Sequence, residues 1–60
     1  MKTYFNSFGD KYYVINATTE VCRERQESGY VYHILQGGFV KNSFEKYCEA
    51  MEAAKKLILK

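Results

Sequence analysis

The sequence predicts a small α+β domain, in which an antiparallel sheet of three to four strands is covered on one face by one C-terminal amphipathic helix. Two observations predict this fold. Up to Gln36, short runs rich in Tyr, Val and Ile alternate with Gly-containing turn segments, as in paired strands. From Asn42 onward, apolar residues recur instead at three- and four-residue steps, the period of a helix with one buried face.

The length limits the chain to a single domain, residues 1–60, because chains this short bury only about 60% of the surface that they expose when unfolded. A hydrophobic fraction of 47% and an aromatic fraction of 17% exclude a disordered tail. We therefore expect a compact domain that needs many of its Tyr and Phe side chains for its core.

Two N-terminal strands are expected to form a hairpin. Residues 2–8 and 11–17 both carry aromatic side chains, and Gly9-Asp10 between them suits a two-residue type II′ turn. Residues 18–26 are more polar and are expected to form an edge strand or, alternatively, a solvated connection.

Residues 30–36, bounded by Gly29 and Gly37-Gly38, form the clearest predicted strand. Alternate side chains of a strand point to opposite faces of the sheet. One face then carries Tyr30, Tyr32 and Ile34, and the other carries Val31, His33 and Leu35. Because both faces are apolar, this strand is expected to lie inside the sheet.

One helix is predicted over residues 42–60. Asn42 is a candidate N-cap with Glu45 reaching back to it, and Ser43 is the alternative cap. The predicted apolar stripe consists of Phe44, Tyr47, Cys48, Met51, Ala54 and Ile58.

Charge and hydropathy exclude several classes of protein. A net charge of +2 and an isoelectric point near 8.6 are only weakly basic. No run approaches the roughly 18 to 20 apolar residues that a membrane span needs, and polar residues interrupt the N-terminus too early for a signal peptide. We therefore expect a cytoplasmic protein in which Cys22 and Cys48 are reduced; a disulfide would need an oxidising compartment.

The C-terminal part of the chain carries a resemblance. The segment FVKNSFEKYCEAMEAAKKL, preceded by GYVYHI, resembles the strand-then-helix ending of many short phage and bacterial open reading frames. The same outline occurs in the arm-type DNA-binding domains of phage integrases. This resemblance covers most of the chain in outline and rests on a helix cap, several aromatic residues and an Ala-rich helix. It implies a module that binds DNA or a small phage accessory protein that binds a host macromolecule.

No catalytic, metal or cofactor site is predicted. His33, Cys22 and Cys48 supply at most three soft ligands, whereas a structural zinc site needs four. Cys22 and His33 could form a nucleophilic pair, with Arg23 and Arg25 favouring the thiolate, but the sequence identifies no third group to orient the base. The protein is therefore predicted not to be an enzyme.

The tyrosines and arginines are the candidate partner-binding residues. If the helix covers the opposite face, the rings of the central strand form an open aromatic surface; alternatively, the rings belong to the core. Arg23 and Arg25 share one side and lie near the tyrosines if residues 18–26 pair with the second strand. The interleaved acidic residues Glu20, Glu24 and Glu27 favour a solvated edge instead. The candidate residues are Tyr12, Tyr13, Arg23, Arg25, Tyr30 and Tyr32.

The predicted function is that of a small non-enzymatic inhibitor or modulator that occludes a partner protein. The alternative is a nucleic-acid-binding module, in which Arg23, Arg25, Lys11 and Lys41 contact phosphates. A third alternative is a homodimer that forms through an exposed strand edge. These hypotheses predict different partners, and none of them involves a membrane.

Overall fold

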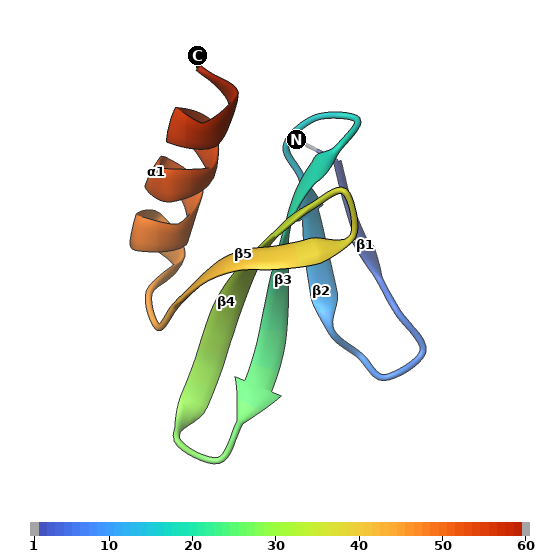
Figure 1. Ribbon diagram of the computed structural model, residues 1–60. Coiled ribbons are helices and arrows are strands. Elements are labelled where there is room, and N and C mark those ends of the chain that lie inside the picture. The colour runs from blue at the N-terminus through green and yellow to red at the C-terminus, as the bar shows by residue number, and fades with distance from the viewer. Residues whose placement is uncertain (1, 60) are drawn as a thin grey trace.

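The computed structural model describes residues 2–59 as a five-stranded antiparallel sheet followed by one helix (Figure 1). The predicted α+β class is confirmed, but the sheet has five strands rather than three or four. Strand order follows chain order, so each strand pairs with its neighbours in sequence. The elements are β1 (Lys2–Phe5), β2 (Lys11–Val14), β3 (Thr19–Gln26), β4 (Gly29–Gln36), β5 (Phe39–Phe44) and α1 (Tyr47–Ile58).

Strand β3 lies in the middle of the sheet, so the prediction of an edge strand or a solvated connection is wrong. It pairs with β2 on one side and, over all eight residues, with β4 on the other. Thr19 and Val21 are fully buried on one face, whereas Glu20 and Glu24 project to the other. Because charged residues alternate with the buried ones, the mean hydropathy of the segment is low. The sequence pattern therefore did not indicate a central strand.

The fifth strand occupies residues that were predicted to begin the helix. Asn42 and Phe44 belong to β5 and pair with β4. The helix begins at Tyr47, and its N-cap residue Lys46 makes no side-chain capping hydrogen bond, so the predicted capping box is absent. Phe44 still packs against the core, but it does so from a strand. The helix ends at Ile58, and the predicted end at Lys60 lies outside the described residues.

The connections between strands follow from local side-chain chemistry. The first hairpin is confirmed, but its turn is a five-residue loop in which the Asn6 side chain accepts hydrogen bonds from the backbone N–H groups of Phe8 and Asp10. Between β4 and β5, Gly37 and Gly38 adopt φ values of 62° and 86°. A two-residue hairpin with positive φ at both positions matches the twist of the flanking strands.

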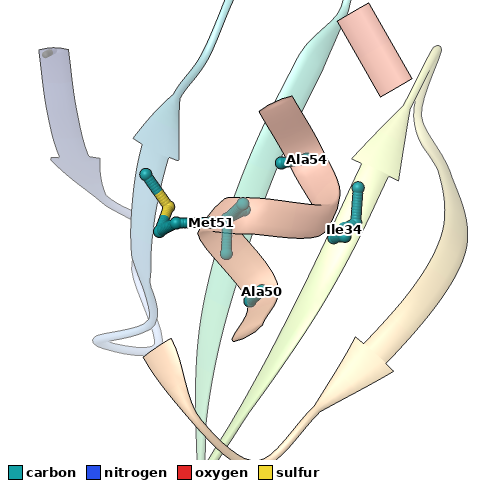
Figure 2. Packing of buried hydrophobic residues seen from close by; sticks show 5 residues of the cluster. Ile34, Ala50, Met51 and Ala54 are labelled. Atoms are coloured by element: carbon teal, nitrogen blue, oxygen red, sulfur yellow. The ribbon is translucent and has the colours of Figure 1, made fainter. Parts of the chain in front are cut away.

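The core lies between the helix and one face of the sheet. Val21 and Ile34 from the sheet contact Ala50, Met51 and Ala54 from the helix (Figure 2). The two alanines have no exposed surface, and their small side chains let the helix backbone approach the strands closely. The rim of this core consists of Tyr13, Ile15, Tyr32, Phe44, Ala53 and Leu57.

The helix covers only part of one face. It contacts β3, β4 and β5, and it does not cover β1 or most of β2. Strand β5 bends where its register with β4 shifts between Ile34 and Leu35, and Figure 1 shows it crossing the sheet at a steep angle. Among residues 2–59, no helix is long and apolar enough to cross a membrane.

Candidate functional site: a cation–aromatic patch on the sheet

Strand pairing places five of the six predicted partner-binding residues on one face. Lys11 pairs with Arg23, and Arg23 pairs with Tyr32. Directly paired residues point to the same face of an antiparallel sheet. The same alternation puts Tyr13, Arg25 and Tyr30 on this face and Tyr12 on the reverse face. Residues 18–26 do pair with the second strand, so the condition under which Arg23, Arg25 and Lys11 neighbour the tyrosines is met.

The helix covers the face that carries Tyr32, so the open aromatic surface expected around this residue is not formed. The Tyr47 ring, from the first turn of α1, lies edge-on to Tyr13 and Tyr32, with centroid separations of 5.2 Å and 5.8 Å. Both rings pack against the buried core. Burial raises the pKa of the Tyr32 hydroxyl. These two tyrosines therefore stabilise the fold and form the inner border of the site.

The residues beyond this border form a surface that we call the cation–aromatic patch. Its members are Phe5, Lys11, Arg23, Arg25 and Tyr30. Phe5 is 61% exposed and Tyr30 is 44% exposed. Phe5 comes from the edge strand β1, and sequence reasoning missed it because only the register Phe5↔Lys11 places it beside the cations.

The cations of the patch are held over aromatic rings. The Nζ atom of Lys11 lies 5.1 Å from the centroid of Tyr13 and 5.9 Å from that of Phe5. The guanidinium carbon of Arg23 lies 4.5 Å from the centroid of Tyr30. Each such contact contributes about 0.5–1 kcal/mol at an exposed site. The rings therefore favour defined positions for two positive charges on this surface.

Carboxylates of the central strand lie on the reverse face. Glu20 accepts a hydrogen bond from the Tyr4 hydroxyl at 2.6 Å, and Glu24 lies 3.2 Å from His33 Nε2. Within residues 2–59, no carboxylate oxygen lies within 4.0 Å of a patch cation. Glu20 and Glu24, which interleave with Arg23 and Arg25 in sequence, thus project from the opposite face of the sheet.

A shallow hollow adjoins the patch at the β3–β4 turn. Its volume is about 400 Å³, and its lining includes Gln26, Tyr30 and Val31. Glu45, which precedes the helix, also lines this hollow. The Nε atom of Arg23 is buried and has no hydrogen-bond partner among the described residues. The head of this side chain is therefore held by its contact with the Tyr30 ring rather than by a network of hydrogen bonds.

The reverse face carries a second set of tyrosines. Tyr4 and Tyr12 stack in parallel with their centroids 4.9 Å apart. The hydrogen bond to Glu20 raises the pKa of Tyr4 to about 12. For Tyr12, a side-chain hydrogen bond with Cys22 raises the pKa of the hydroxyl and one with Asn6 lowers it. The hydrogen bond with Cys22 has the larger effect, so the pKa of Tyr12 is raised. Tyr12 is therefore a member of this second aromatic cluster and not of the patch.

Cys22 and His33 are backbone partners on the reverse face, as the sequence permitted. Arg23 and Arg25 point to the other face and do not favour the Cys22 thiolate. Burial, the largest influence, raises the pKa of the Cys22 thiol. No group of three or more His, Cys, Asp or Glu residues within 2–59 is arranged to hold a metal ion.

His33 has two polar neighbours that sequence reasoning missed. Its Nδ1 atom lies 2.7 Å from Ser43 Oγ, and its Nε2 atom lies 3.2 Å from Glu24 Oε1. Ser43 was expected in a helix, where it would not face His33. Only the fifth strand brings the two residues together, as backbone partners.

No protein-family model matches the chain, and no curated protein or solved structure gives a significant match.

Proposed function

We propose that the protein is a non-enzymatic binding protein that inhibits or modulates a partner protein by occluding an acidic surface of it. The observation that carries this proposal is the separation of charges on β3. Arg23 and Arg25 project with Tyr30 on one face, whereas Glu20 and Glu24 project on the other. A surface with exposed rings and ordered cations, none of which has a carboxylate of residues 2–59 within 4.0 Å, is complementary to an acidic surface with apolar groups.

The composition of the patch supports a protein partner. Arg and Tyr are the residues that most often dominate the energy of protein interfaces. Here Arg23 is already ordered over the Tyr30 ring, which reduces the side-chain entropy lost on binding. A short, rigid chain that presents such a surface acts by covering its partner.

Site-specific photocrosslinking tests this proposal. A photoreactive phenylalanine analogue at the exposed position Phe5 is expected to capture a partner from a native lysate, and excess unlabelled protein is expected to compete. The variant Arg25→Glu should not compete, whereas Lys55→Glu, with the same charge change on the helix, should compete fully. Equal competition by both variants, with both folded, would contradict the proposal.

The second candidate is binding of single-stranded nucleic acid. The alternation of rings and cations on one face also suits it, because bases stack on aromatic rings while Lys11, Arg23 and Arg25 contact phosphates. Three phosphate contacts predict a slope of about −2 for the logarithm of affinity against the logarithm of salt concentration. Fluorescence anisotropy with single- and double-stranded oligonucleotides at two salt concentrations measures this slope.

A further inference from the structure

Three side chains from three adjacent strands form a continuous hydrogen-bonded chain on the reverse face. Glu24 is on β3, His33 on β4 and Ser43 on β5. The imidazole lies between the other two groups, at 3.2 Å from Glu24 Oε1 and 2.7 Å from Ser43 Oγ. Ser43 is exposed, and the side chain of His33 is 24% exposed. This chain of groups shares no residue with the cation–aromatic patch.

The two contacts favour one tautomer of the neutral imidazole. A carboxylate only accepts hydrogen bonds, so the nitrogen that faces Glu24, Nε2, carries the proton. The other nitrogen, Nδ1, then has a lone pair and accepts the hydrogen bond of the Ser43 hydroxyl. Gln26 Nε2 donates to the same Glu24 oxygen at 2.7 Å and holds the carboxylate in place. A hydroxyl, a base and a group that orients the base are thus assembled.

We infer that Ser43 is an activated nucleophile that accepts acyl groups from small activated esters or thioesters, with His33 as its general base and Glu24 as the positioning residue. The Ser43 oxygen forms a bond to the acyl carbon while its proton passes to His33 Nδ1. The bond from the acyl carbon to the leaving group then breaks, and the leaving group departs with the electron pair. The imidazolium releases its proton to the leaving group or to water.

The open position of the site defines the donors that fit. Ser43 lies on the outermost strand of the sheet and is exposed, so a small acyl donor reaches it without any rearrangement. Water solvates the developing oxyanion there, so the increase in the rate of acylation comes from the general base alone. General-base assistance typically contributes about 10²- to 10⁴-fold. Donors with good leaving groups, such as aryl esters and thioesters, are therefore the expected class.

Acylation by p-nitrophenyl acetate tests the inference. The exposed thiol of Cys48 would compete, so the experiment uses the variant Cys48→Ala. Intact mass is expected to show one acetyl group per chain, and peptide mapping is expected to place it on Ser43. Ser28 is the internal control, because it is an exposed serine in the β3–β4 turn. We expect at least about tenfold faster acetylation of Ser43 than of Ser28, and equal rates after unfolding in guanidinium.

Variants separate the three roles. Ser43→Ala should abolish the acetylated peptide, and His33→Asn should reduce acetylation of Ser43 to the rate of Ser28. For Glu24, the ¹⁵N chemical shifts of the His33 imidazole report which nitrogen carries the proton. A purely structural role of Glu24 would leave this tautomer unchanged. They should report a proton on Nε2 in the parent protein and a mixture of tautomers in Glu24→Gln.

Three outcomes would overturn the inference. The first is equal acetylation of Ser43 and Ser28 in the folded protein. The second is an unchanged release of p-nitrophenolate in Ser43→Ala, which would make His33 itself the nucleophile. The third is an acetyl group that peptide mapping places on Cys22, the backbone partner of His33, and that neutral hydroxylamine removes, as it removes a thioester.

Discussion

The guanidinium carbon of Arg23 lies 4.5 Å from the centroid of the Tyr30 ring, although the backbone partner of Arg23 is Tyr32. The contact is therefore diagonal across β3 and β4. Tyr32 is engaged by Tyr47 from the helix, so Arg23 extends the other way, toward the tip of the hairpin. This one contact joins the rim of the core to the exposed patch.

A double-mutant cycle should show that this contact stabilises the fold. We expect a coupling of about 0.5–1 kcal/mol between Arg23→Met and Tyr30→Leu in the free energy of unfolding. Urea denaturation of the parent, both single variants and the double variant measures it. The pair Lys55→Met and Tyr30→Leu is the control, because Lys55 is exposed on the helix, and it should be additive. A coupling equal to that of the control would contradict the contact.

The two faces of β4 should differ in their sensitivity to truncation. Ile34 is fully buried under the helix, so Ile34→Ala should lower the free energy of unfolding by about 2–5 kcal/mol. Its neighbour Leu35 is only half-buried on the reverse face, and Leu35→Ala should cost less than about 2 kcal/mol. Thermal or urea unfolding provides both values. Equal costs would mean that the helix does not cover the Ile34 face.

The two thiols should react at different rates. Cys48 is exposed on the helix, whereas Cys22 is buried and has a raised pKa. Because the thiolate is the nucleophile, iodoacetamide should alkylate Cys48 at least about tenfold faster than Cys22. Mass spectrometry of digested protein follows both sites, and the rates should converge in denaturant. Faster reaction at Cys22 in the folded protein would contradict the register that buries it.

As the pH rises, the hydroxyl of Tyr4 should be among the last of the tyrosine hydroxyls to ionise. The hydrogen bond to Glu20 raises its pKa from 10.0 to about 12, so the protonated form is favoured in the folded state. The resulting stabilisation is complete below pH 10 and is lost as the pH rises toward 12. Glu20→Gln removes the negative charge and should lower this pKa toward 10.0.

Ultraviolet titration of tyrosinate, with Tyr4→Phe to assign the transition, measures the effect of Glu20. The control is Glu27→Gln in the β3–β4 turn, which should leave the transition in place. An unchanged transition in Glu20→Gln would show that Tyr4 and Glu20 do not interact in solution.

Pairing between strands accounts for the parts of the candidate site that the sequence did not predict. Alternation along residues 30–36 was sufficient to place Tyr30 and Tyr32 on one face, and this prediction is confirmed. It could not show that the helix would choose this face, since both faces of the strand are apolar. Phe5 and Ser43 acquire their neighbours only through the registers of β1 and β5, which span separate hairpins.

The local pattern of residues by itself determined that strands precede a single amphipathic helix, because side-chain period and turn chemistry act over a few neighbouring positions. Tertiary structure decided that Asn42 and Phe44 extend a fifth strand instead of starting the helix. Pairing with β4 satisfies the backbone of these residues and brings Phe44 to the core, which outweighs a local preference for a cap. Packing of the helix on β3, β4 and β5 likewise decided which tyrosines are buried and which remain on the surface.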